Sequence, residues 1–119
     1  MLMSVPNVSE GSDAGLLDAI GRAFAPARLL DVHRDSDHGR SVFTLLSKQG
    51  ELALALASGA RQAVECIDIS AHAGIHPHVG AIDVVPVVYL TPEQRGAACA
   101  EALLAAHLIG DHAGVPVFL

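Results

Sequence analysis

The clearest potential for chemistry lies in three histidines within a span of seven residues: His72, His76 and His78. Pro77 excludes a helix here because it lacks a backbone donor, and it pushes His76 toward extended geometry. We therefore predict a shaped loop that presents imidazoles and leads into an apolar strand. Imidazole titrates near neutral pH and is the usual general acid or base. A histidine-rich surface loop without chemical function fits the same residues equally well.

A zinc site is a weaker interpretation of the same histidines. Imidazole nitrogens bind zinc, and those of His72, His76 and His78 can converge from an extended loop. A tight fourth ligand is missing, because Cys66 and Cys99 lie elsewhere, within apolar helical patterns. Isolated cysteines of this kind usually pack as small core residues, and two of them do not make a disulfide framework. We therefore assign no metal ligand.

Composition narrows the possible classes of function. The chain has 119 residues, enough for one domain, residues 1–119, with a real core. Its formal charge is −6 and its few lysines and arginines are scattered, which argues against nucleic-acid binding and against a polybasic membrane anchor. We expect no export signal, because the first six residues lack a basic region followed by an apolar run, and no membrane span, because no uninterrupted apolar stretch reaches bilayer-spanning length. We expect a cytoplasmic protein that acts on small molecules.

The rest of the chain alternates between strand and helix patterns. Expected strands cover about residues 2–5, 27–32, 41–47, 81–90 and 115–119, and expected helices cover about residues 12–24, 51–67 and 91–109. In the helices, Ser12 and Thr91 are placed as N-caps, and Gly110 is placed as a stop signal. The order β-α-β-β-α-β-α-β indicates an α/β (α+β) two-layer sandwich of the ferredoxin-like kind, with helices on one face of a mixed β-sheet.

Polar residues interrupt this pattern at three places. Asn7, Ser9 and Glu10 follow the first strand and form either a simple connection or the edge of a ligand site. Residues 33–40 are expected to be a hairpin loop, in which two arginines, two aspartates and two histidines come together. Asp83 lies near the start of an apolar run. Since an unpaired buried carboxylate is costly, we expect it to bond the backbone of the histidine loop or an imidazole.

The apolar periodicity also predicts which side chains form the core. The expected set is Leu16, Ile20, Leu30, Val42, Phe43, Leu56, Val64, Ile67, Val84, Val87, Leu103 and Ile109.

Several motifs resemble the formiminotransferase (glutamate formimidoyltransferase) family. Residues 5–11 resemble its VPNFSEG opening, and residues 29–32 and 40–44 resemble its LLDV and NR(S/T)VYT segments. Residues 67–86 resemble its IDMS-x-H-x-G-x-HP-x-x-GA(L/I)DV-x-P block. Residues 115–119 resemble its VPVYL strand. The matches keep register and cover nearly the whole chain. They correspond to the first of the two subdomains in that family's transferase unit.

The resemblance implies transfer of a formimino group from N-formimino-L-glutamate to N5 of tetrahydrofolate, a step of histidine degradation and of folate one-carbon metabolism. It places the catalytic histidine at His76 and makes tetrahydrofolate the co-substrate. The residues that it implies for binding folate and substrate are Asn7, Ser9, Glu10, Asp31, Arg40, His72, Gly74, His78, Gly80 and Asp83. In the family folate lies between the two subdomains, so we expect a homo-oligomer or a complementary C-terminal-type subdomain.

The chain departs from the family pattern at a few polar positions. It has His33 where the family tends to have an acid, Gly39 in place of Asn, Ile75 in place of Glu, and His78 in place of an Arg that could pair with a ligand carboxylate. The alternative function is therefore a non-catalytic folate-binding or interaction module. In either case we expect one face, holding His76, Asn7 and residues 33–40, to be an unfilled and unusually apolar half-site.

Overall fold

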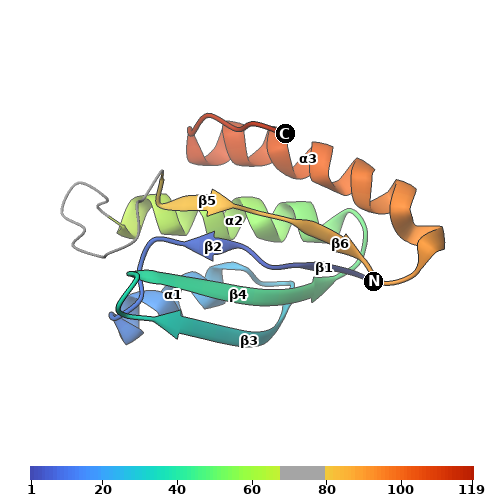
Figure 1. The fold of residues 1–119 in the computed structure, drawn as a ribbon. Coiled ribbons are helices and arrows are strands. Elements are labelled where there is room, and N and C mark those ends of the chain that lie inside the picture. The colour runs from blue at the N-terminus through green and yellow to red at the C-terminus, as the bar shows by residue number, and fades with distance from the viewer. Residues whose placement is uncertain (68–79) are drawn as a thin grey trace.

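An antiparallel sheet forms one layer of the protein (Figure 1). The computed structural model describes residues 1–67 and 80–119. Neighbouring strands lie in the lateral order β3, β4, β1/β2, β5/β6, because β1 and β2 follow one another along β4, and β6 and β5 pair with them on the other side. The strands are β1 (Leu2–Ser4), β2 (Asn7–Val8), β3 (Arg28–Asp35), β4 (Arg40–Ser47), β5 (Ile82–Val84) and β6 (Val87–Tyr89).

Two prolines interrupt neighbouring rows of this sheet. Pro6 separates β1 from β2, and its carbonyl still accepts a hydrogen bond of 3.0 Å from the backbone nitrogen of Phe43. Pro86 separates β5 from β6, and its carbonyl accepts a bond of 2.7 Å from the hydroxyl of Ser4. The single continuous strand expected over residues 81–90 is therefore two short strands. They are partly exposed, because this row is the sheet's edge, where proline is tolerated.

The predicted two-layer α/β sandwich is confirmed, and the order of rows is that of the ferredoxin-like arrangement. The expectation of a mixed sheet is wrong for the part that the structure describes, since each of its strand pairings is antiparallel. The expected strand at residues 115–119 is also wrong. Gly114 adopts a left-handed conformation with φ 68°, and the segment beyond it turns back along the preceding helix instead of joining the sheet.

The second layer consists of helices that lie behind the sheet in Figure 1. They are α1 (Ala14–Ala23) and α2 (Glu51–Cys66), and a third helix, α3 (Arg95–Ala113), packs along α2 and reaches β6. The N-cap of α1 is Asp13, one residue later than expected. A three-residue 3₁₀ turn, η2 (Pro92–Gln94), precedes α3, and the side chain of Thr91 makes no capping bond. α3 passes through Gly110. No helix in the described ranges is long and apolar enough to cross a membrane.

The core lies between the sheet and the helices. Alternate side chains of β4 are buried there, among them Phe43 and Leu45. The ring of Phe24 packs on that of Phe43, with 5.3 Å between ring centroids. On the other side of Phe24 lies Gly59 of α2, where an added Cβ would stand 2.1 Å from the ring. Only glycine lets α2 approach this closely.

The expected core is confirmed in part. Ile20, Phe43, Leu56, Ile67 and Ile109 are buried, and Leu16, Val42, Val64 and Val87 are half-buried. The expectation is wrong for Leu30, Val84 and Leu103, which are exposed. Leu30 has no opposite residue because the pairing of β3 with β4 shifts there. Val84 points to the face without helices, and α3 has apolar residues on all sides.

Candidate functional site on the open face of the sheet

Within residues 1–67 and 80–119, one face of the sheet carries no helix, and this open face holds most of the described residues that the motifs single out. In β4 the burial alternates strictly, so that Ser41 and Phe43 face the helices while Arg40 and Val42 face the open side. Residues paired directly across neighbouring strands share a face. The strand register therefore shows which residues lie side by side on the open face, and each set of residues paired across the strands is called a row.

The open face is polar at one end and apolar at the other. One row at the polar end runs from His33 through Val42 and Asn7 to Val84. In the row beyond it, Asp35 lies opposite Arg40. At the other end of the sheet a row runs from Arg28 through Leu46 and Met3 to Val88.

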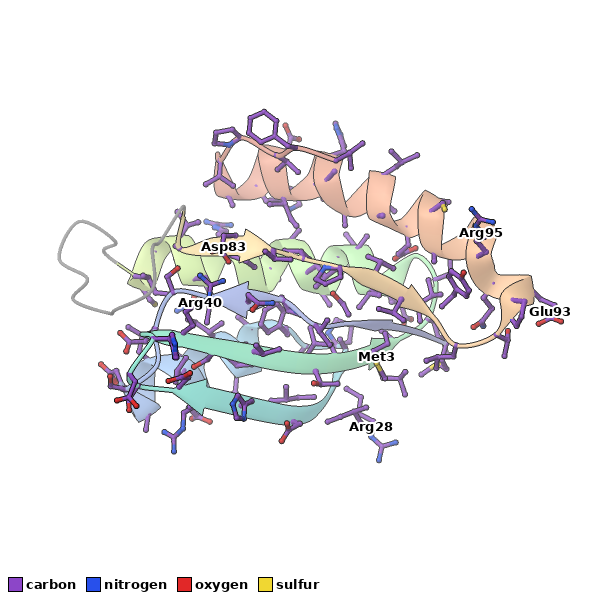
Figure 2. All side chains as sticks on the ribbon, in the orientation of Figure 1. Met3, Arg28, Arg40, Asp83, Glu93 and Arg95 are labelled. Carbon is purple, nitrogen blue, oxygen red and sulfur yellow. The ribbon has the colours of Figure 1, made fainter. Side chains whose placement is uncertain are left out.

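The polar end is held by an ion pair between Arg40 of β4 and Asp83 of β5, which Figure 2 shows turned toward one another. Nη1 of Arg40 donates to Oδ2 of Asp83 at 2.7 Å, and Nη2 donates to Oδ1 at 2.6 Å. The side chains are only 14% and 9% exposed. The hydrogen bond from Arg40 to Asp83 raises the pKa of the guanidinium, which burial opposes. A two-pronged contact of this kind fixes geometry as well as charge.

This pair corrects the expected partner of Asp83. We expected the carboxylate to bond the backbone of the histidine loop or an imidazole, but it bonds the guanidinium of Arg40. Strand register explains the contact, because β4 and β5 both flank β2 and the two side chains meet at its end. No local sequence signal joins two residues 43 positions apart.

Ser9 anchors the segment that leads into β5. Its hydroxyl donates to the carbonyl of Gly80 at 2.6 Å, and its backbone nitrogen donates to the carbonyl of Ala81 at 2.8 Å. The side chain is completely buried. This geometry gives Ser9 a positioning role, because it ties the end of β2 to the segment that leads into β5.

Glu10 organises the loop before α1. Its Oε2 accepts hydrogen bonds of 3.0, 2.8 and 3.1 Å from the backbone nitrogens of Gly11, Ser12 and Asp13. A Cβ at Gly11 would stand 2.1 Å from the carbonyl oxygen of Asp35, so a glycine lets this loop approach the end of the β3–β4 hairpin. The carboxylate therefore fixes the backbone of the loop that joins β2 to α1.

Two other predicted binding residues lie on the open face itself. Asn7 is half-buried, and its Nδ2 donates to the carbonyl of Val5 at 3.0 Å. Asp31 is exposed and lies opposite Thr44. Their contact with a ligand remains a prediction.

Only half of the polar stretch 33–40 is the expected loop, and the other half is strand. β3 continues to Asp35 and β4 begins at Arg40, so the turn between them spans only residues 36–39. Oδ1 of Asp35 accepts a bond of 3.1 Å from the backbone nitrogen of His38, whose Nδ1 lies 2.5 Å from Oδ2. The pKa of Asp35 is lowered, chiefly by the bond from the His38 backbone. Paired strands offer the polar residues regular hydrogen bonds, which composition alone does not reveal.

The predicted catalytic residue His76 and the predicted binding residues His72, Gly74 and His78 lie outside the described residues. The alternative zinc site rests on the same histidines. In the described ranges, no group of three possible metal ligands comes together.

One carboxylate with a clear role was not predicted. Glu101 of α3 is buried and reaches across to the start of α2. Oε1 accepts a hydrogen bond from the backbone nitrogen of Gly50, and Oε2 accepts one from Ala53, each at 2.7 Å. Glu101 thus caps α2 from another helix, in place of a local capping side chain. The only signal in the sequence is a charged residue within an apolar helix.

Comparison with known proteins agrees with these motifs. The model of the formiminotransferase domain, N-terminal subdomain, matches residues 1–119. The chain is 36% identical over 118 residues to glutamate formimidoyltransferase of Thermoplasma acidophilum, covering 97% of this chain and 39% of that protein. It is 37% identical over 125 residues to formimidoyltransferase-cyclodeaminase of Gallus gallus, covering 97% and 22%. Against glutamate formimidoyltransferase of Streptococcus pyogenes the identity is 34%, covering 97% and 40%.

These relatives are considerably longer than the chain, which spans between about a fifth and two-fifths of their length. The match nevertheless covers the chain from end to end and includes the strands, the hairpin and the anchor at Ser9 that build the open face. The chain therefore belongs to the family of formiminotransferase N-terminal subdomains.

Proposed function

We propose that this chain forms one half of a formimidoyltransferase site, which moves a formimino group from N-formimino-L-glutamate to N5 of tetrahydrofolate. The observation that carries the proposal is the convergence of Asn7, Arg40 and Asp83 on one end of the open face. These residues come from separate motifs of the family that the chain belongs to. This step belongs to histidine degradation and folate one-carbon metabolism, and the cytoplasm remains the predicted compartment.

In this proposal His76 is the acid–base residue. As N5 of tetrahydrofolate attacks the amidine carbon, a bond forms between N5 and carbon and N5 must lose a proton. When the bond between that carbon and the glutamate nitrogen breaks, the departing nitrogen must gain a proton. One imidazole with a pKa near neutrality can accept the first proton and deliver the second.

Arg40 and Asp83 are proposed as positioning residues. Nη1 and Nη2 of Arg40 each donate a hydrogen bond to a carboxylate oxygen of Asp83. The ion pair between Arg40 and Asp83 therefore offers little net charge to a substrate. It links β4 to β5 directly beside the anchor between Ser9 and Gly80. Together these contacts hold both the hairpin and the segment that begins at Gly80 in fixed places, which is what precise alignment of reactants requires.

The open face is proposed to be completed by a second sheet, from another copy or from a C-terminal-type subdomain. Its apolar end presents Met3, Leu46 and Val88 to solvent on neighbouring strands. Val88 is exposed and the other two side chains are half-buried, and apolar side chains that remain partly exposed on neighbouring strands favour an interaction surface. Asn7, Arg40 and Asp83 lie at the other end of the same face, so a covering sheet would enclose them.

The test is a formimino-transfer assay with the chain alone and with a separately expressed C-terminal-type subdomain. The chain alone is expected to bind tetrahydrofolate weakly in isothermal titration and to transfer little. Addition of the subdomain is expected to restore binding and turnover, and His76→Gln is expected to abolish turnover while leaving the complex intact. A lone monomer that turns over at about 1 per second or more would contradict the half-site. A complex that binds tetrahydrofolate without any transfer would favour the non-catalytic module.

A further inference from the structure

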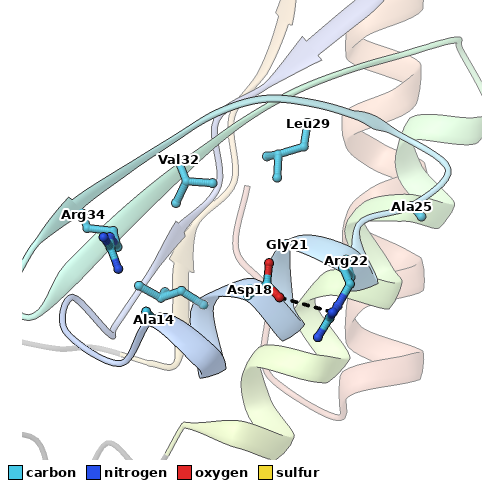
Figure 3. Close-up of a pocket in the computed structure, with 9 residues that line it drawn as sticks. Ala14, Asp18, Gly21, Arg22, Ala25, Leu29, Val32 and Arg34 are labelled. Carbon is cyan, nitrogen blue, oxygen red and sulfur yellow. Dashed lines mark ion pairs between the residues drawn. The ribbon is translucent and has the colours of Figure 1, made fainter.

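A groove of about 580 Å³ runs between α1 and β3 (Figure 3), on the side of β3 that faces away from the candidate site. α1 packs mainly against α2, which leaves the space beside β3 unfilled. The helical wall consists of residues spaced three and four apart between Ala14 and Ala25, and the strand wall consists of Leu29, Val32 and Arg34. The groove is open to solvent, and its lining is mainly apolar with a few polar groups.

A bulge in β3 creates the apolar floor of the groove. The register of β3 against β4 shifts between Leu29 and Asp31, so that Leu30 is an extra residue. Because of this extra residue, Leu29 faces the same side as Val32 and Arg34 rather than the open face. The shift thus places the side chains of Leu29, Val32 and Arg34 on the same face of β3.

Small residues on α1 keep the groove open. A Cβ at Gly21 would stand 3.3 Å from Cδ2 of Leu29, so even one added carbon would narrow the space. Leu29 remains 41% exposed on the floor. Covering this side chain with an apolar group would remove its surface from water and stabilise a complex.

The edge of β3 supplies a second feature of a peptide site. Within the described residues β3 pairs with β4 alone, so the backbone groups on its outer side have no neighbouring strand. Such an edge can accept an added extended segment, whose alternate side chains then enter the adjacent cleft. The helical part of the wall, from Ala14 to Arg22, extends roughly 12 Å at the helical rise per residue, which is the length of about four residues of extended chain.

The charges along the groove point to an acidic ligand. Asp18 and Arg22 pair with one another at 3.2 Å, so they offer little net charge. Arg34 has no partner among the residues that the structure describes, and Figure 3 places it at the end of the groove near Ala14. A carboxylate is the natural partner of a guanidinium.

We propose that the groove between α1 and β3 binds an extended peptide segment that adds to the edge of β3, packs apolar side chains on Leu29 and Val32, and places a carboxylate on Arg34. The partner is therefore an apolar, acidic segment of another protein. This interaction does not depend on the proposed function, since the groove lies behind the open face.

The test uses a fluorescent peptide of about seven residues that alternates valine and threonine and carries one glutamate, with fluorescence polarisation and amide chemical shifts as readouts. Saturable one-to-one binding is expected, with shifts confined to α1 and β3. Arg34→Gln, or glutamine in place of the glutamate, is expected to weaken binding about tenfold or more, and added salt should weaken it as well. Arg28→Gln is the matched control, because Arg28 lies on the same strand but faces the open side.

Several outcomes would overturn the proposal. Equal loss of affinity in Arg34→Gln and Arg28→Gln would show that the peptide responds only to general charge. Ala14→Phe, at an exposed position, should fill one end of the groove and block binding without lowering the melting temperature, so unaltered binding would place the peptide elsewhere. Binding of dodecanoate without binding of the peptide would indicate a small-molecule site. Self-association of the chain through β3, seen as concentration-dependent sedimentation, would identify a second copy as the occupant.

Discussion

At the residue scale, the contact between Arg40 and Asp83 shows how two motifs far apart in sequence act as one unit. We expect Asp83→Asn to lower the free energy of unfolding by about 2–4 kcal/mol, because it leaves a nearly buried guanidinium without its carboxylate. The double variant Arg40→Met with Asp83→Leu should recover much of that loss. Urea denaturation of Asp83→Asn, of Arg40→Met and Asp83→Leu singly, and of the double variant measures these effects, and strictly additive losses in the last three would show that the pair is not coupled.

The turn between β3 and β4 gives a prediction about the pH dependence of local stability. Hydrogen bonds from His38 hold the pKa of Asp35 below its ordinary value of 3.8. A group whose pKa is lower in the folded state stabilises that state above its unfolded pKa, and the contribution disappears as the pH falls through the folded pKa. We therefore expect the amide of His38 to lose protection from hydrogen exchange only below the ordinary range of Asp35. Asp35→Asn should show no such acid-dependent step in exchange.

At the element scale, α2 depends on a cap that another helix supplies. Glu101→Ala removes the acceptor for two backbone donors at the start of α2. Leaving buried donors unpaired should lower the free energy of unfolding by about 1–3 kcal/mol. Glu65→Ala is a control of the same chemistry, since Glu65 pairs with Arg61 on an exposed helix face and should cost about 0.5 kcal/mol at most. Thermal unfolding distinguishes the two variants.

Two helical glycines should respond to alanine in opposite directions. Gly59→Ala forces a methyl group into the ring of Phe24, and overpacking of this kind should cost about 1–3 kcal/mol or more. Gly96→Ala in α3 meets nothing within 4 Å, so the better helix former should stabilise the protein by about 0.5–1 kcal/mol. Chemical denaturation of both variants provides the comparison, and similar effects would contradict the packing described for Phe24.

Elements were predictable where the chain repeats a simple pattern. The helix that became α2 and the strand that became β4 were predicted almost residue for residue, because their apolar positions keep one period throughout. The strand expected over residues 81–90 failed at Pro86, and α3 passed the expected stop at Gly110. Pro86 interrupts the strand because it has no backbone donor for the sheet, whereas Gly110 is tolerated within the helix and the chain leaves the helix only at the left-handed Gly114.

The residues of the candidate site were predicted as a set, but the contacts among them were not. Arg40, Asp83, Ser9 and Gly80 were all singled out from motifs. Their mutual contacts depend on which strands are neighbours, and a linear pattern does not contain that order. The groove beside β3 was missed because a bulge at one residue, Leu30, decides which side chains share a face.

At the scale of the whole molecule, the proposed ligand site and the proposed docking surface lie at opposite ends of the open face. We expect Val88→Ser, at the apolar end, to weaken association with a covering subdomain while leaving the melting temperature nearly unchanged, because Val88 is already exposed. Sedimentation velocity measures the association. Thr44→Ser, a smaller change on the same face, is the control. Equal association of Val88→Ser and the unaltered chain would place the partner elsewhere.

The bond between Ser9 and Gly80 also has a consequence for the order of folding. Its two residues are 71 positions apart in the sequence, so it closes after the hairpin and α2, whose contacts are local. The polar end of the sheet should then be the last part to assemble and the first to open. Amide exchange of Ser9, whose nitrogen donates to Ala81, should proceed through a lower-energy opening than exchange within α2. The contacts proposed to align the reactants would thus form late in folding and open before the contacts within the hairpin and α2.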